Sequence, residues 1–142
     1  MATDHFQSPD YYNIDELLTD EHKLIRDSVR AWVKKEVSPI IEEHAQNGTF
    51  PVHLVKELGN LGVFRPTIPQ KYGGGGLDYI SYGLMMQELE RGDSGIRSVA
   101  SVQGSLVMFP INEYATEEQK MKWLPGLGNG DLLGCFGLTE AN

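Results

Sequence analysis

Apolar residues recur at three- and four-residue steps through most of this chain, which is the spacing of helices that bury one face. The first helix is expected to begin at Thr19, whose hydroxyl can cap a first turn that carries two acids. Pro39 should end or kink this helix, and a short amphipathic turn should follow and close near Gly48. Residues 1–18 are polar with scattered aromatics, so we expect them to form an N-terminal extension on the surface.

Three further helices can be placed from the residues at their ends. A helix rich in leucine should exit at Gly62 in a left-handed conformation. Asp78 can cap the next helix, which should stop at Gly92. Thr116 begins a capping-box sequence for a short helix that is expected to end at Pro125. The sequence therefore predicts a mainly α-helical protein.

The stretch 94–112 is expected to be the central helix, because its apolar positions have helical spacing and its one formal charge is Arg97. A helix without a charged face is normally surrounded by protein, and the serine, glutamine and glycine here make a poor membrane span. A guanidinium effectively cannot lose its proton, so Arg97 needs an anion. Asp93 and Glu90 are the local candidates, and the alternative is a ligand carboxylate that enters a cleft.

Glycine-rich stretches and an apolar run mark the other features of the chain. Residues 73–76 lack the strand before and the Lys-Ser/Thr after that a phosphate-binding loop needs, so they should form a flexible turn. The glycines of 126–130 should end the helical pattern, and the run 132–139 suits a buried strand. A single strand cannot form a sheet, so the chain is expected to stop within a domain. The helical domain then spans 19–130, and 131–142 begins a truncated second domain.

Charge and composition exclude several classes of site. The formal net charge of −8 argues against a nucleic-acid partner, and no basic cluster interleaved with aromatics is present. Cys135 is the single cysteine, and the four histidines are scattered without ligand spacing, so we expect no disulfide and no metal site. The N-terminus has no apolar signal region and no Arg-rich presequence. This fits the cytoplasm, or the mitochondrial matrix if a presequence has been removed.

The residues from Gly134 to Asn142, Gly-Cys-Phe-Gly-Leu-Thr-Glu-Ala-Asn, resemble the first signature of the acyl-CoA dehydrogenases. The order of parts is also similar to that family: a helical domain, an Ala-Thr-Glu-Glu-Gln-Lys helix that ends in Trp-Leu-Pro, and a glycine turn into a β domain. The resemblance covers nearly the whole chain from about residue 15. It implies the N-terminal all-α domain of that family, followed by the first strand of a truncated, β-barrel-like middle domain.

Within the family, the stretch 90–103 is most similar to the glutaryl-CoA dehydrogenases. The resemblance implies that Arg97 holds the distal carboxylate of the acyl chain, with a bidentate fork that suits a planar carboxylate. It also implies that Glu90, Ser98 and Ser101 line the same end of the substrate pocket.

The resemblance further implies FAD as cofactor, with Phe136, Gly137, Leu138 and Thr139 lying against the flavin ring. The implied reaction is the oxidative decarboxylation of glutaryl-CoA to crotonyl-CoA, with electrons passed to an electron-transfer flavoprotein. The family's general base is a glutamate beyond residue 142, so no catalytic residue is expected here and the fragment alone should be inactive. A homotetramer is implied for the full-length enzyme.

The sequence is also compatible with other functions. An enzyme for another dicarboxylic or arylsuccinyl acyl-CoA would also use an arginine here, and a short-chain acyl-CoA enzyme would keep the fold. A non-catalytic helical interaction module is the alternative from a different class.

Overall fold

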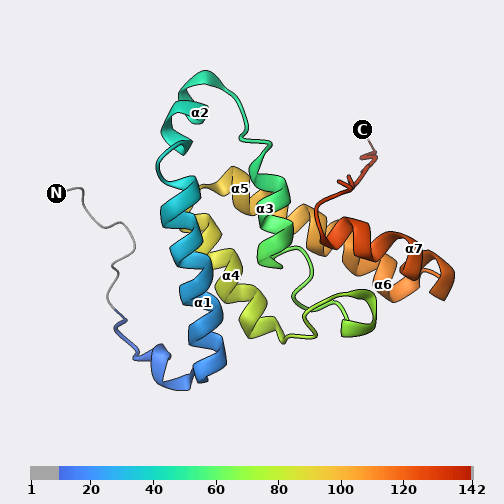
Figure 1. Ribbon diagram of the computed structural model, residues 1–142, viewed down its shortest axis with the longest axis horizontal. Coiled ribbons are helices and arrows are strands. Elements are labelled where there is room, and N and C mark those ends of the chain that lie inside the picture. Colours follow the sequence, from blue (N-terminus) through green and yellow to red (C-terminus); the bar gives the residue numbers. More distant parts are fainter. Residues whose placement is uncertain (1–9, 142) are drawn as a thin grey trace.

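The computed structural model describes residues 10–141. In this part of the chain the ordered elements are all helical, and Figure 1 shows how they are arranged. The elements in chain order are η1 (Ile14–Leu17), α1 (Asp20–Trp32), η2 (Val33–Val37), α2 (Ile41–Asn47), α3 (Leu54–Leu61), η3 (Gln70–Tyr72), α4 (Tyr79–Gly92), α5 (Ser94–Ser101), η4 (Val102–Met108), α6 (Phe109–Tyr114) and α7 (Glu117–Gly128). The mainly α-helical class is thus confirmed. Part of the proposed N-terminal extension, residues 1–9, lies outside the described residues.

The helix caps lie where local sequence predicts them. Thr19 accepts a hydrogen bond from His22 N in a capping box at the start of α1, and Thr116 makes the equivalent box at the start of α7. Asp78 caps α4 by accepting from Ser81 N at 2.8 Å. Gly62 ends α3 with φ of 84°, the left-handed conformation that favours glycine.

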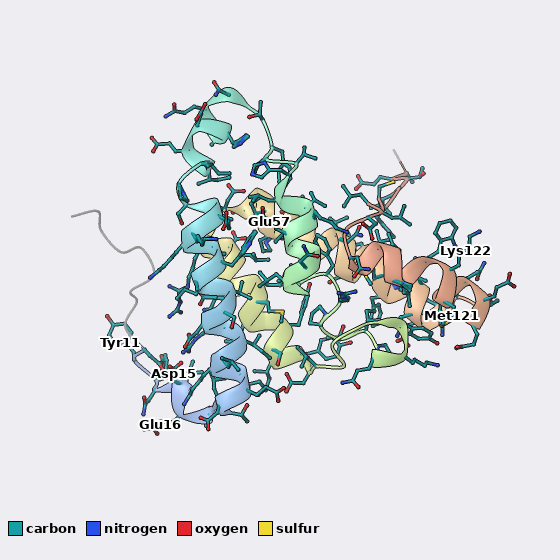
Figure 2. All side chains as sticks on the ribbon, viewed as in Figure 1. Tyr11, Asp15, Glu16, Glu57, Met121 and Lys122 are labelled. Carbon is teal, nitrogen blue, oxygen red and sulfur yellow. The ribbon has the colours of Figure 1, made fainter. Side chains whose placement is uncertain are left out.

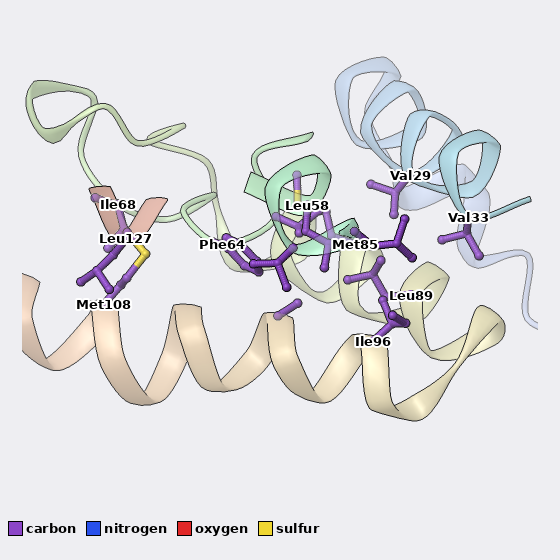
Figure 3. Close-up of a cluster of buried hydrophobic side chains, with 14 of the residues drawn as sticks. Val29, Val33, Leu58, Phe64, Ile68, Met85, Leu89, Ile96, Met108 and Leu127 are labelled. Atoms are coloured by element: carbon purple, nitrogen blue, oxygen red, sulfur yellow. The ribbon is translucent and has the colours of Figure 1, made fainter. Parts of the chain in front are cut away.

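The core lies between α1, α3, α4 and the central helix, as Figure 3 shows for the labelled residues. Four side chains of this core are completely buried: Val33 at the start of η2, which continues α1, Leu58 on α3, Leu89 on α4 and Ile96 on α5. Polar links join the same elements: Glu57 on α3, labelled in Figure 2, accepts the indole N–H of Trp32 at 3.2 Å. The apolar stripes therefore identify the packed faces of the helices, and the Trp32–Glu57 hydrogen bond links α1 to α3 beside them.

The central helix runs without interruption through α5, η4 and α6, and η4 is a π-helical stretch within it. The expectation that protein surrounds this helix is wrong, because Leu106 is 44% exposed and Phe109 is 38% exposed. The helix packs on α4 through α5 and on α7 through η4 and α6, and it leaves apolar residues such as Leu106 and Phe109 partly open to solvent. Low charge therefore does not mean complete burial here.

The C-terminal part differs from expectation in two ways. Helix α7 continues through Pro125 to Gly128 and does not end at the proline. Asn129 N donates to Pro125 O at 3.0 Å, and the turn away from the helix comes at Gly130, with φ of 70°. Beyond it, residues 132–141 are extended but form no strand within the described part of the chain. A strand needs a partner for its backbone groups, and the helices offer none.

Among residues 10–141, none of the helices combines the length and the apolar character that a membrane crossing requires. The same residues contain no group of three or more His, Cys, Asp or Glu side chains arranged to hold a metal ion.

Candidate functional site

The turn between α4 and α5 brings the first part of the candidate site together. Asp93 is extended, with φ of −166°, and its carboxylate accepts from Ile96 N at 2.8 Å. This cap starts α5 immediately after α4 ends, so the two helices pack against each other. Glu90 near the end of α4 then faces Arg97 in the first turns of α5. Asp93 is used as the cap and is not the partner of Arg97.

Glu90, Arg97 and Ser101 form one hydrogen-bonded cluster, as the stretch 90–103 led us to expect. Arg97 Nε donates to Glu90 Oε2 at 2.7 Å, and Arg97 Nη1 donates to Ser101 Oγ at 3.3 Å. Ser94 Oγ donates to the other Glu90 oxygen at 2.6 Å. Ser101 Oγ in turn donates to the backbone carbonyl of Ser98 at 3.1 Å. Ser98 therefore joins the cluster through its backbone.

This cluster is open to solvent, unlike a buried structural ion pair. The Arg97 side chain is 34% exposed and that of Glu90 is 48% exposed. Hydrogen bonds from Arg97, first, and from Ser94 lower the pKa of Glu90, so its carboxylate stays ionised at neutral pH. Within residues 10–141 no hydrogen bond is made by Arg97 Nη2. The guanidinium thus keeps donors for a further acceptor.

A second arginine shows what a structural pair looks like in the same fold. Arg30 Nε and Nη2 donate to the two oxygens of Glu88 at 2.9 and 2.8 Å, and the Glu88 side chain is completely buried. Arg91 Nε lies 3.6 Å from the same carboxylate. Sequence reasoning missed this pair. The sequence offered one signal, which is that Glu88 lies on the buried side of α4. The partner could not be identified from local spacing, because Arg30 lies on α1.

The second part of the candidate site is the extended segment that leaves α7. Phe136 is 52% exposed and Leu138 is 69% exposed, and Thr139 is exposed as well. Within the described chain, the backbone from Cys135 to Glu140 makes no hydrogen bond. No atom lies within 4 Å of a Cβ placed on Gly137. The segment therefore has backbone N–H and C=O groups and apolar side chains that no other part of the described chain uses.

In the described structure no hydrogen bond or ion pair joins Glu90, Arg97 or Ser101 to the segment 136–139. The glycine run 73–76 belongs to neither part. The N–H groups of Gly74, Gly75 and Gly76 donate to Pro69 O, Arg65 O and Ile68 O, so this turn is internally bonded. With those donors used, the run is not a phosphate cradle.

Comparison with known proteins identifies relatives of the helical domain described above. A model of the acyl-CoA dehydrogenase N-terminal domain matches residues 19–131. The mitochondrial short-chain specific acyl-CoA dehydrogenase of Bos taurus is 36% identical over 123 residues, which are 87% of this chain and 30% of that protein.

Two solved structures are similar as well. A glutaryl-CoA dehydrogenase from Mycobacterium smegmatis in complex with FADH2 has a TM-score of 0.87 and 48% identity, over 91% of this chain and 33% of that one. Butyryl-CoA dehydrogenase from Megasphaera elsdenii has a TM-score of 0.82 and 36% identity, over 88% of this chain and 33% of that one. The chain spans about a third of the length of these relatives.

Proposed function

Because this chain belongs to the acyl-CoA dehydrogenase family, we propose that it forms the N-terminal helical domain of an FAD-dependent enzyme acting on glutaryl-CoA. The proposed reaction is oxidative decarboxylation to crotonyl-CoA, with electrons delivered to an electron-transfer flavoprotein. The 48% identity to a glutaryl-CoA dehydrogenase favours this substrate over a plain acyl-CoA.

The observation that carries the substrate proposal is the partial exposure of Arg97. Glu90 holds the guanidinium through Nε and Nη1 donates to Ser101, whereas Nη2 makes no hydrogen bond within residues 10–141. A carboxylate at the end of an acyl chain can accept from the Nη2 side, where the planar fork of arginine matches its two oxygens. Ser101 adds a hydroxyl bonded to Arg97, and Ser98, one turn before Ser101 on the same helix, is proposed as a further substrate contact. In this role the residues bind and orient the acid group, and they move no proton.

The segment Phe136–Thr139 is proposed as the part of this chain that contacts the flavin. Bound FAD would supply the acceptor for the hydride that leaves the acyl chain. The chain's own contribution is a set of unpaired backbone N–H and C=O groups, the Thr139 hydroxyl, and apolar cover from Phe136 and Leu138. Glu90 has no part in proton abstraction, because it is bonded to Arg97 at the end of the site assigned to the distal carboxylate.

The substrate assignment predicts a selective effect of Arg97→Ala in the complete enzyme that contains this chain. We expect kcat/KM for glutaryl-CoA to fall by roughly 10²-fold, because truncating one partner of a charge-assisted pair costs a few kcal/mol. Turnover of butyryl-CoA, which has no distal carboxylate, should change by less than about threefold. Steady-state assays with both substrates measure this difference.

Ser94→Ala is the matched control, because it removes another hydrogen bond to Glu90 and leaves the guanidinium in place. It should preserve the preference for glutaryl-CoA. If Arg97→Ala reduces both substrates equally, Arg97 is a structural residue and the glutaryl-CoA assignment is wrong.

A short-chain acyl-CoA dehydrogenase is the second candidate. The observation that favours it is that Glu90 already neutralises Arg97, together with 36% identity to the short-chain and butyryl-CoA enzymes. On that alternative the unchanged enzyme would turn over butyryl-CoA faster than glutaryl-CoA.

A further inference from the structure

Gln103 is the one residue of the central helix whose side chain holds the C-terminal segment by hydrogen bonds within the described chain. Its side chain is buried, with 1% of the residue exposed. The amide Nε2 donates to Leu127 O at 2.9 Å and to Leu132 O at 2.8 Å, and Oε1 accepts from Gly134 N at 3.0 Å. Two carbonyl acceptors and one N–H donor determine the orientation of the amide. Both N–H groups and the oxygen of the side chain are therefore used on the last turn of α7 and on the chain that leads from it to the segment 136–139.

The local helix geometry places Gln103 for these contacts. It lies in the π-helical stretch η4, and π-helical turns inside α-helices are frequent at functional sites. The next residue, Gly104, packs on the backbone of the preceding loop: a Cβ there would lie 3.0 Å from Phe64 O. A larger residue at this position would push the helix off that loop and move Gln103 with it.

Gly134 is the last point at which the segment is held. Its N–H is bonded to Gln103, and a Cβ on Gly134 would collide with the side chain of Val107 on the same central helix. From Cys135 to Glu140, no further backbone hydrogen bond is present in the described residues. The position at which residues 135–140 leave the helical domain thus depends on the contacts of Gly134 with Gln103 and Val107.

We propose that Gln103 is a positioning residue that sets the distance between the carboxylate-binding Arg97 and the flavin-contacting segment, an inference that rests on the function proposed above. Arg97 and Gln103 belong to one rigid helix and are about 9 Å apart along it at 1.5 Å per residue. One helix therefore holds the acid end of the substrate directly and the flavin segment through the Gln103 amide. A change at Gln103 alters the alignment of these two parts without touching substrate or cofactor.

The first experiment measures hydrogen exchange at the Gly134 amide in this chain, which needs no flavin. Gln103→Met keeps the length of the side chain but loses all three hydrogen bonds, and exchange at Gly134 should become at least about fivefold faster. Tyr82→Phe is the matched control. Tyr82 lies on α4, and its hydroxyl bonds Ser105 in the same η4 at 2.6 Å, so this variant removes a bond of η4 that does not involve the C-terminal segment. It should leave exchange at Gly134 unchanged. Equal exchange in the parent chain and Gln103→Met would overturn the inference.

The second experiment uses the complete flavin-loaded enzyme. Gln103→Met should change the visible circular dichroism of the flavin and lower kcat by on the order of 10²-fold, with little effect on KM, as expected when reacting groups are misplaced by about 1 Å. Gln103→Glu keeps an oxygen for Gly134 N–H but faces the carbonyls of Leu127 and Leu132 with an oxygen in place of the donor, so it should not restore either signal. If Gln103→Met does not fold, Gln103→Asn takes its place, because its shorter side chain cannot reach Gly134.

The outcomes separate this inference from the proposed function. A parent enzyme that binds no flavin would refute the proposed function, whereas the exchange experiment would still report on the Gln103 contact. A parent enzyme with normal flavin, in which Gln103→Met keeps the flavin spectrum and kcat, would refute the positioning role alone.

Discussion

Arg30 and Arg97 both contact a glutamate of α4, but the two glutamates differ in exposure. Glu88 is completely buried and receives two hydrogen bonds from Arg30, whereas Glu90 is 48% exposed and receives one from Arg97. Removing one partner of a buried pair leaves an uncompensated charge, so Arg30 is committed to the fold. An exposed pair contributes little to stability, which leaves Arg97 available for a ligand.

Asp78 provides a test of electrostatics at the residue scale. Hydrogen bonds from Ser81, first, and from His22 lower the pKa of Asp78 from 3.8 to about 2. His22 Nδ1 accepts from Thr19 N, so Nε2 carries the proton and donates to Asp78 at 2.9 Å. Because the folded-state pKa is depressed, this contribution to stability is complete above pH 3.8 and is lost as the pH falls toward about 2.

Asp78→Asn should therefore flatten the pH dependence of the free energy of unfolding in that acid range. Asparagine is as good an N-cap as aspartate, so α4 should stay capped and the stability at neutral pH should change little. Urea unfolding followed across the acid range measures this. An unchanged pH profile in Asp78→Asn would show that the Asp78 contacts are not formed in solution.

At the scale of elements, close packing of backbones explains one of two glycines that lie inside helices, where the intrinsic helix propensity of glycine is low. Gly59 lies inside α3, where a Cβ would collide with the backbone carbonyl of Asn129 after α7. Gly83 lies inside α4, where no atom is within 4 Å of such a Cβ. One glycine is needed for the contact between α3 and the end of α7, and the other has no packing role.

Replacing these two glycines by alanine should have opposite effects. Gly83→Ala should stabilise the chain by about 0.5–1 kcal/mol, the usual gain in a helix interior. Gly59→Ala should destabilise it, by about 1–3 kcal/mol, because the added methyl group forces α3 and the end of α7 apart. Urea midpoints of the two variants test this contrast, and a gain in stability for both would disprove the close contact.

At the scale of the whole molecule, exposed apolar side chains are found around the end of the chain that carries the segment 136–139. A pocket of about 440 Å³ lies beside α6 and α7, with Trp123, Leu132 and Leu133 among its lining residues. Phe136 and Leu138 follow directly, and both are more than half exposed. By contrast, α1 and α4 pack against each other, and Figure 1 shows α1 on the opposite side of the molecule from this end. The apolar pocket beside α6 and α7 and the proposed flavin contact thus lie at the same end of the molecule.

This exposure leads to a prediction for the 142-residue chain expressed alone. One exposed segment offers the flavin a single wall, so we expect the purified chain to show no flavin absorbance and no dye reduction with glutaryl-CoA. Circular dichroism should still report a helical protein. Retained flavin together with turnover would contradict the assignment of the remaining cofactor contacts to other parts of the enzyme.

Much of the fold follows from interactions between residues close in sequence. The caps at Thr19, Asp78 and Thr116 and the left-handed exit at Gly62 each involve one turn, and each lies where the pattern predicts it. For Arg97 the sequence left Asp93, Glu90 and a ligand open as partners, and the structure shows the bond to Glu90. The roles assigned to Arg97 and to the segment 136–139 came from motif resemblance and stay proposals.

The sequence by itself therefore determined the helices, their caps and the family, because helical period and capping depend on spacings of three and four residues. Only the tertiary structure decided the exposed face of the central helix, the continuation of α7 past Pro125, the Arg30–Glu88 pair and the Gln103 contacts. The partners in the last two lie 58 and 31 residues apart. Such contacts depend on how whole helices pack, and no local spacing encodes them.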